Sequence, residues 1–428
     1  MAKTESTAAR DVRLIEEEVQ FTAWANGGAA LGRLADGRVV FANGVLPGER
    51  ARVRFAEKDA RFVSAEVVKL LEKSPMRIEP RCPLYGKCAG CCMQNLEYVD
   101  QLHAKREILI DHLKRIADIA DAEKPVLPML AAPSEWNYAR SLLLGLDAAG
   151  NFCVPDRKGN LLKLEAYCPI TAECLNEVLA SFTFEPDSGI GELEFRADDQ
   201  DGIQLILRGD SDKPEDEMEN DTEISVVYQG PESSWVMAGV STLQQTAAGI
   251  KICAADSSPF IKNPAILDVL CEKLLPMLDG LERVSLLDIN CGTGFWSRWF
   301  GERCAEVNAL MADENQCEDF VYNLDDLDNV SLYIGDVTEV LPGLSKPSNE
   351  EWILIEGGTT GLHESALSAV ASRNPRKIIC IYEDPAIFAR DLKRLTAAGL
   401  QVQTVLPYDP APQTAAIGAV AVLVWKEK

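Results

Sequence analysis

Three cysteines in one short loop have the spacing of metal ligands. Cys82, Cys88 and Cys91 lie in the segment CPLYGKCAGCC, where Gly86 and Gly90 allow the backbone to turn tightly. Thiolate ligands to an iron–sulfur cluster commonly come as such a close group plus one ligand from elsewhere in the chain. The spacing therefore predicts a metal site, iron–sulfur ahead of zinc in the same sulfurs, with plain buried thiols as the remaining alternative.

The fourth ligand has two candidates. Cys92 directly follows Cys91, so its side chain is expected to point away from the other three thiols. Cys168, just ahead of Pro169, is the best remote candidate. The chain has 13 cysteines and a polar N-terminal segment without the pattern of a secretory leader, which favours reduced thiols and metal binding over disulfides.

The overall charge argues against nucleic-acid binding by bulk electrostatics. The 428 residues carry a formal net charge of −25, and the pI is near 4.6, so any RNA site must be a local basic patch. Residues 210–223 hold part of the excess acid and are interpreted as a solvated loop. No apolar run approaches membrane-spanning length, so we expect a soluble, cytoplasmic protein without membrane contact.

The hydrophobic pattern divides the chain into three domains. Residues 13–72 show short alternating strands at close spacing, which is typical of a small β-barrel. Residues 73–262 form a β-rich central domain with the cysteine loop and an amphipathic helix at 98–119, whose expected packing partner is the next domain. Residues 263–428 alternate strands and helices, which predicts a Rossmann-like α/β domain.

Basic side chains gather in two places. Along the predicted barrel they are Arg33, Arg38, Arg50, Arg52, Arg54, Lys58 and Arg61. On the predicted helix at 98–119 they are Lys105, Arg106, Lys114 and Arg115. The first set predicts a basic face on the barrel, against the alternative of ordinary outward-facing charge on alternating strands. The second makes the helix the most basic neighbourhood in the chain.

A glycine loop follows the first strand of the α/β domain. The strand ends at Asp288, and Gly292 and Gly294 follow as a GxG that lets the backbone approach a ligand at the carboxyl edge of a parallel sheet. A later strand, 330–334, is followed by Asp336, where an acid could contact an adenine. The two features together predict a cofactor site.

The order of these segments resembles the RNA uracil-C5 methyltransferase family, in the branch with an N-terminal TRAM barrel and a 4Fe-4S cluster. The similarity covers nearly the whole chain and is carried by GRLADGRVVFANGVLPGERARV, CPLYGKCAGC, LLDINCGTGF and EDPAIFARDL. It implies binding of structured RNA, either rRNA or tRNA and not DNA. The cluster ligands implied by the resemblance are Cys82, Cys88, Cys91 and Cys168. The implied S-adenosylmethionine-binding residues are Asp288, Gly292, Gly294, Asp336 and Asn263.

The catalytic residues of the family are replaced. In the family a cysteine thiolate adds to uracil C6, which makes C5 able to take the methyl group, and a carboxylate base then removes the C5 proton. Glu383 stands at the position of that cysteine, and a carboxylate is a weak carbon nucleophile. Ala416 and Gly418 stand where the family has a histidine and the glutamate base. Cys380, on the opposite face of the same strand, is interpreted as a core cysteine.

The cofactor site also lacks some of the polar residues that the family uses. Met311 falls where an acid would hold the ribose hydroxyls, and Ile261 falls where a glutamine precedes Asn263. Glu356 begins a segment that reads EGGT in place of the usual Asp-Pro-Pro-Arg. The resemblance therefore implies a weakened S-adenosylmethionine site.

Three functional hypotheses follow. The first is an RNA-binding relative that is inactive in uracil-C5 methylation, which the joint loss of thiol, base and ribose acid favours. The second is an active S-adenosylmethionine-dependent RNA methyltransferase with a different target or nucleophile, in which Glu356, Glu383 or Asp384 acts as base or ligand. The third is an acidic protein that binds a protein partner and has no RNA function. The sequence leaves open the enzymatic activity, the RNA and the base.

Overall fold

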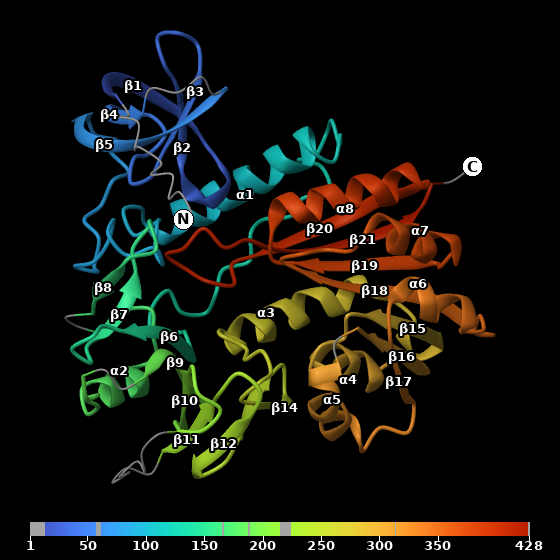
Figure 1. Cartoon of the computed structure of the whole chain (residues 1–428). Coiled ribbons are helices and arrows are strands. Elements are labelled where there is room, and N and C mark those ends of the chain that lie inside the picture. The colour runs from blue at the N-terminus through green and yellow to red at the C-terminus, as the bar shows by residue number, and fades with distance from the viewer. Residues whose placement is uncertain are drawn as a thin grey trace, which may run out of the picture.

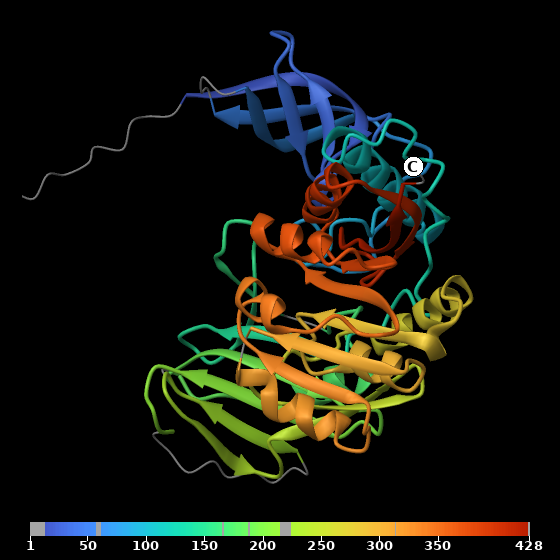
Figure 2. The same cartoon turned by 90° about the vertical axis from the view of Figure 1, so that its right-hand side faces the viewer.

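The computed structural model describes residues 13–56, 61–164, 167–186, 189–214, 224–312 and 314–426. Lys58 and residues 215–223 of the expected acidic loop lie outside these ranges. Figure 1 shows the N-terminal barrel and the central sheet one above the other beside the C-terminal α/β domain, and Figure 2 shows the same parts from the side. No helix in the described ranges is long and apolar enough to cross a membrane.

The N-terminal barrel closes from five strands in the order β1-β2-β3-β5-β4. Its strands are β1 (Leu14–Trp24), β2 (Ala30–Arg33), β3 (Val39–Ala42), β4 (Arg50–Ala56) and β5 (Phe62–Glu72). Alternate side chains such as Phe21 and Val53 point inwards and are fully buried. The predicted β-barrel is confirmed, with two strands longer than the short ones expected.

Ion pairs neutralise much of the predicted basic face of the barrel. The register of β1 against β4 places Glu16 opposite Arg54 and Glu18 opposite Arg52, and the pairs close at 2.6 and 3.1 Å. Arg50 pairs with carboxylates of β1 and β5. The prediction of a basic surface was wrong for these three arginines, because antiparallel pairing aligns them with glutamates that lie more than thirty residues earlier.

The helix α1 (Tyr98–Arg115) packs on the C-terminal domain. Leu109 and Leu113 of this helix join the same buried cluster as Phe388 and Leu392 of α8 (Pro385–Ala397). The helix ends earlier than the pattern predicted, and Asp118 beyond it has a φ of 56°, which is not a helical conformation.

The basic side chains of α1 are used inside the fold. Lys105 is fully buried, and its Nζ lies 2.6 Å from Oδ1 of Asp409. Arg106 donates to two backbone carbonyls, whereas Lys114 and Arg115 pair with nearby carboxylates. The most basic neighbourhood in the sequence is therefore not a surface of free charge, because each of its four cations has an acceptor within the protein.

The middle part of the chain forms a seven-stranded sheet of order β12-β11-β10-β9-β6-β7-β8, at the lower end of the molecule in Figures 1 and 2. Its strands are β6 (Ser141–Leu146), β7 (Phe152–Pro155), β8 (Leu161–Lys163), β9 (Ile190–Ala197), β10 (Ile203–Gly209), β11 (Ser225–Gln229) and β12 (Ser234–Ala238). The short helix α2 (Glu173–Leu179) buries Leu175 against this sheet. A separate hairpin, β13 (Thr242–Ala247) and β14 (Ile250–Ala255), leads into the C-terminal domain.

The C-terminal sheet has the order β17-β16-β15-β18-β19-β21-β20. Its strands are β15 (Val284–Ile289), β16 (Glu306–Met311), β17 (Val330–Ile334), β18 (Glu350–Gly358), β19 (Lys377–Tyr382), β20 (Leu400–Tyr408) and β21 (Gly418–Trp425). The helices besides α8 are α3 (Pro264–Leu274), α4 (Phe295–Gly301), α5 (Cys317–Leu324), α6 (Val337–Val340) and α7 (Glu364–Ser372). β21 runs antiparallel to both neighbours. Strand order reverses between β15 and β18, and sheets of this kind bind ligands at such a point.

Candidate cofactor and substrate cavity

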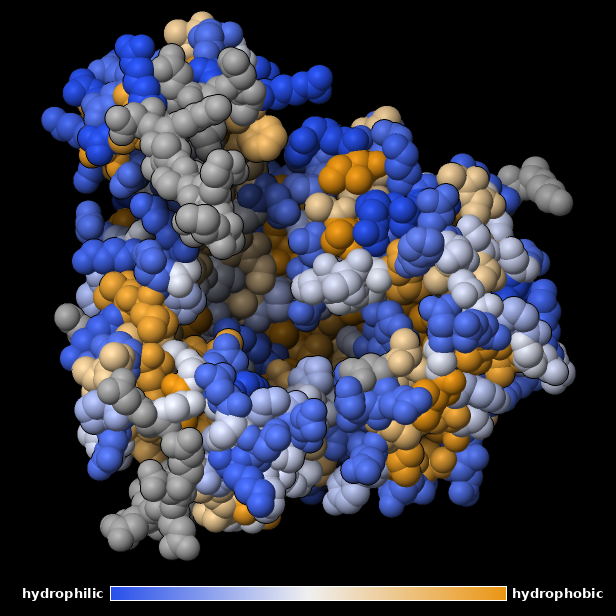
Figure 3. Space-filling model, in the orientation of Figure 1, coloured by the Kyte–Doolittle hydropathy of each residue, from blue (hydrophilic) through white to orange (hydrophobic). Residues whose placement is uncertain are grey.

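A cavity of about 760 Å³ opens at the carboxyl ends of β15, β18 and β19. The loop after β15, the start of α3 and the segment 408–416 form its walls, and Gly90 of the cysteine loop reaches its rim. Figure 3 shows a hollow with an apolar floor in the middle of this face, in the region where Figure 1 places the start of α3. The volume is in the range of small-molecule sites.

Several walls of the cavity were not anticipated from the sequence. Phe260 and Tyr408 line it, but neither belongs to a recognised motif. The segment 409–416 follows β20, a strand that the sequence analysis did not identify. The available signal was the mixed apolar and polar segment LQVQTVL at 400–406, which begins with strand-like alternation and is followed by Pro-Tyr-Asp-Pro, a combination typical of a strand that ends in a turn.

Two of the residues predicted to bind the cofactor line the cavity. Gly292, with a φ of 53°, lies in the wall beside Thr293. Asn263 also lines it, and its Nδ2 donates to Pro410 O at 3.1 Å. The amide of Asn263 therefore holds the segment 408–416 in place.

Gly294 and Asp336 are not among the described residues that line the cavity. Gly294 has a φ of 94°, and a Cβ there would lie 2.3 Å from Leu324, so glycine is required for the loop to enter α4. Asp336 is exposed and caps α6, since its Oδ1 accepts from Thr338 N at 2.7 Å. One oxygen of this carboxylate is therefore used within its own helix. The adenine contact predicted for Asp336 remains a prediction.

Glu356 lines the cavity, and its carboxyl pairs with that of Asp288, which is fully buried. Burial raises the pKa of Asp288 to about 7 and raises that of Glu356 well above its usual range. Ser297 Oγ donates to Asp288 Oδ2 at 2.5 Å. Asp288 Oδ1 and Glu356 Oε1 have no other donor among the described residues, and one proton held between the two carboxyls would satisfy both oxygens. The pKa directions place that proton on Glu356.

Stability is expected to fall as the pH rises from about 4 to about 7. The pKa of Asp288 is raised from 3.8 to about 7 in the fold, so over this window the folded state holds protons that the unfolded state has released, and rising pH favours unfolding. Asp288→Asn should make this slope shallower, because one of the two carboxyl groups with a raised pKa is removed while Glu356 keeps its own. Urea unfolding at pH 5 and pH 8 measures the effect. Asp336→Asn is the control, and equal slopes for wild type and Asp288→Asn would rule out a shared proton.

Glu383 projects into the cavity from the end of β19. Its backbone N–H donates to Gly358 O at 2.9 Å, but its carboxyl makes no hydrogen bond or ion pair with a described residue. Solvent reaches the side chain through the cavity, while the surrounding protein raises its pKa. The neighbouring Asp384 is different, because its carboxylate caps α8 by accepting from Ala386 N and Ile387 N at 2.8 Å.

The ring of Tyr408 fills the space beside position 418, where the related family has its base. Gly418 lies directly opposite Tyr408 in the β20–β21 pairing, and a Cβ on Gly418 would lie 2.1 Å from the Tyr408 ring. Ala416 lines the cavity but carries no polar group. Tyr382 covers Gly357 in the same way, at 2.2 Å. The structure therefore leaves no space for a larger side chain at 418 while Tyr408 keeps its place.

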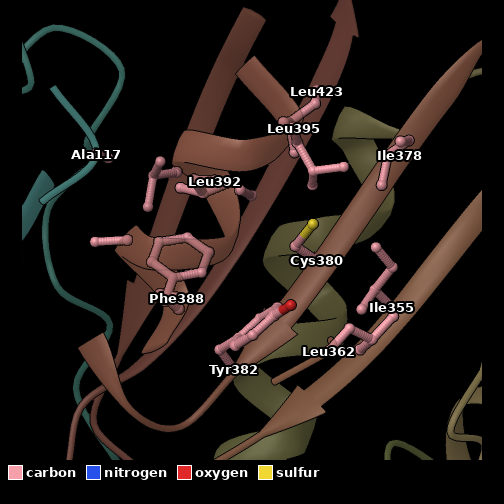
Figure 4. Packing of buried hydrophobic residues seen from close by; sticks show 14 of the residues in the cluster. Ala117, Ile355, Leu362, Ile378, Cys380, Tyr382, Phe388, Leu392, Leu395 and Leu423 are labelled. Carbon is pink, nitrogen blue, oxygen red and sulfur yellow. The ribbon is translucent and has the colours of Figure 1, made fainter. Parts of the chain in front are cut away.

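Cys380 does not reach the cavity. It lies in the apolar core, 1% exposed, beside residues such as Ile355 and Leu395 (Figure 4). Burial raises the pKa of its thiol far above the usual value, so the reactive thiolate is suppressed. The interpretation as a core cysteine agrees with this position.

Cys168 lies close enough to the other three predicted metal-ligand thiols to raise their pKa values. Burial raises the pKa of Cys82, Cys88 and Cys91, and the nearby Cys168 raises each of them further. Cys91 and Cys168 pack on the same small cluster as Tyr138. Within the described ranges, however, no three His, Cys, Asp or Glu side chains form a group that could hold a metal ion.

Cys92 faces another part of the molecule. A Cβ built on Gly28 of the barrel would lie 2.8 Å from Cys92 Sγ. The backbone of this residue is tied to the cavity segment, because Cys92 N and Met93 N both donate to Gln413 O, at 3.1 and 3.0 Å. Gln101 Nε2 donates to the Gln413 side chain at 2.9 Å. The cysteine loop and the cavity wall are therefore joined by direct hydrogen bonds.

Comparison with known proteins finds a solved structure with the same overall fold. No protein-family profile matches the chain. The structure is similar to the tRNA (uracil-54, C5)-methyltransferase of Pyrococcus abyssi in complex with S-adenosyl-L-homocysteine, with a TM-score of 0.72 and 18% identity. The alignment covers 95% of this chain and 100% of that one, so the shared fold includes the N-terminal barrel.

Sequence relatives of similar length carry the name of RNA methyltransferases. An uncharacterized RNA methyltransferase of Streptomyces coelicolor is 27% identical over 427 residues, covering 95% of this chain and 92% of the relative. One from Bacillus cereus is 25% identical over 452 residues, covering 96% and 97%. The named class of these relatives agrees with the resemblance found in the sequence.

Proposed function

We propose that this protein binds S-adenosylmethionine and structured RNA, and that it does not methylate uracil at C5. The observation that carries the proposal is the cavity, which has Glu383 at the position of the nucleophile and Tyr408 over the position of the base. The named class of the relatives and the complex of the fold neighbour with S-adenosyl-L-homocysteine support the two ligands.

The glycine loop fits the cofactor, but fewer polar side chains are present to hold it. Gly292 and Thr293 would present backbone groups to it, and Phe295 adds an apolar wall. Met311 is buried beneath the loop and offers no carboxylate to a ribose. When bound, S-adenosylmethionine supplies an electrophilic methyl group on a sulfonium.

A basic surface beside the cysteine loop supports RNA binding. Backbone pairing brings this loop against the β7–β8 hairpin, since Ala89 N donates to Pro155 O at 2.9 Å. Tyr167, half exposed, lies next to Cys168 and could stack on a base. The exposed cations of this surface, which make no ion pair with a described residue, are Arg81, Lys87, Arg157, Lys158 and Lys163.

Calorimetry and RNA binding on the anaerobically purified full chain test the proposal. Titration with S-adenosylmethionine should give micromolar affinity, with ATP as the control ligand; absence of binding would contradict the cofactor part. Lys87→Glu with Arg157→Glu should weaken binding of structured RNA at least tenfold and reduce its salt dependence, since two phosphate contacts are lost. Lys273→Glu on α3 is the matched control, and equal affinities would place the RNA elsewhere.

We also propose a 4Fe-4S cluster at Cys82, Cys88, Cys91 and Cys168. The effect of Cys168 on the pKa values of Cys82, Cys88 and Cys91 supports the proposal, because it places the remote thiol near the other three and thiolates repel one another until metal ions neutralise them. A four-iron cluster is wider than one ion, so its ligands lie farther apart than those of a single metal. Clustered cysteine ligands of this kind are typical of iron–sulfur sites.

Cys168→Ser is expected to remove most of the iron and sulfide, whereas Cys92→Ser should leave both near the wild-type content. Cys92 faces Gly28, so its thiol is not a ligand in this arrangement. Chemical iron and sulfide analysis of anaerobically purified protein measures the difference. Equal losses in both variants would mean that the fourth ligand is misassigned, and colourless protein containing zinc would contradict the cluster itself.

A further inference from the structure

The cavity is lined by a carboxyl group that makes no hydrogen bond or ion pair within the described part of the chain. The charged side chains that line it are Lys262, Glu356 and Glu383. The Glu356 carboxyl faces Asp288 and is engaged by it. Glu383 alone has a carboxyl without a hydrogen bond or ion pair among the described residues, and it projects into open space from the strand end.

The wall around Glu383 is apolar. Ile381, Tyr408 and Ala416 line the cavity near it. The charge of Glu383 contributes to the raised pKa of Tyr408. A ligand that fills the cavity displaces the water around this carboxylate, and the carboxylate then gains most from a ligand that donates hydrogen bonds, because an acceptor left without a donor away from water is costly.

Nucleobases differ in what they can offer this acceptor. Cytosine and adenine carry exocyclic amino groups, N4 and N6, that donate to carboxylates. Uracil presents a carbonyl oxygen at the equivalent place, and this oxygen would be repelled by the carboxylate. A base entering the cavity must leave its stack, and such enzymes read the flipped base by hydrogen bonds to its polar edge.

We propose that the cavity takes a flipped cytosine or adenine of RNA and that Glu383 is the base for methylation of its exocyclic nitrogen. The proposal rests on the proposed binding of S-adenosylmethionine and RNA, and it names the substrate class of that site. The amino nitrogen attacks the sulfonium methyl group, the N–CH₃ bond forms, and the S–CH₃ bond breaks with its electron pair left on sulfur. The N–H proton passes to the carboxylate of Glu383, so the products are the N-methylated base and the neutral thioether.

Two features of the site suit this step. No covalent adduct is required, because nitrogen supplies its own lone pair, so the absence of a thiol at 383 is no obstacle. Burial raises the pKa of Glu383, and a base with a higher pKa takes a proton more readily at neutral pH.

The test uses methyl-labelled S-adenosylmethionine and total RNA from a strain of the source organism that lacks this protein. After digestion to nucleosides, label is expected in a cytidine or adenosine methylated on its amino group and not in 5-methyluridine. Glu383→Gln should lower the rate at least 100-fold while the affinities for S-adenosylmethionine and RNA stay within twofold of wild type. Glu383→Asp should recover part of the rate, and Glu364→Gln on α7 is the control outside the cavity.

The outcomes separate this inference from the proposed function. If wild-type protein binds both ligands but transfers no label, the inference is wrong and the proposed binding stands. Label in 5-methyluridine, or an N-methylated product made equally well by Glu383→Gln, also overturns it. If S-adenosylmethionine does not bind in the parallel calorimetry, the proposed function and the inference both fail.

Discussion

Replacement of Lys105 by methionine is expected to lower the free energy of unfolding by about 3–5 kcal/mol. Lys105 and Asp409 are both fully buried and lie 2.6 Å apart. Removal of the ammonium leaves a carboxylate without its counter-charge in a site that water does not reach. Burial lowers the pKa of Lys105, and the carboxylate of Asp409 opposes that shift, so the pair depends on both partners.

Urea unfolding of wild type and Lys105→Met measures this loss. Lys114→Met is the matched control on the same helix, because its pair with Glu123 is exposed and such pairs contribute at most about 1 kcal/mol. Lys105→Met combined with Asp409→Leu should regain much of the stability, since an apolar pair removes the unpaired charge. If Lys105→Met and Lys114→Met cost the same, the ion pair is not essential to the fold.

A second large effect is expected from glutamate at position 418. Gly418→Glu should destabilise the protein by about 3 kcal/mol, because its Cβ would lie 2.1 Å from the Tyr408 ring and a charge would enter a buried strand. Thermal unfolding of the variant against wild type measures the loss. Gly343→Glu is the control, since a Cβ there meets nothing within 4 Å.

The same geometry predicts that uracil methylation cannot be restored by putting the family's cysteine and glutamate back at positions 383 and 418. Glu383→Cys alone lacks a base, and Glu383→Cys with Gly418→Glu lacks the space for one while Tyr408 remains. Neither variant should form 5-methyluridine in RNA, measured after nucleoside digestion. Formation of 5-methyluridine by either variant would mean that another group serves as the base or that Tyr408 moves aside at low cost.

Local patterns in the sequence were sufficient for the outline of the fold. Alternation of apolar residues marked the barrel, and buried runs followed by glycine marked β15 and its loop. These signals are local, because strand and helix periodicity depends on neighbouring residues. The cysteine spacing and the loop at Gly292 were visible for the same reason.

Tertiary structure alone decided how the charged and polar groups are used. Lys105 meets a carboxylate 304 residues away, and Glu356 meets Asp288 across neighbouring parallel strands. Sequence patterns on a single helix or strand show which side chains share a face, but not which distant partner is buried against them. The free energy of a charge depends on that partner and on access to water. The burial of Lys105 in an ion pair, and the cavity position of a Glu383 carboxyl without a partner among the described residues, were therefore decided only by the folded chain.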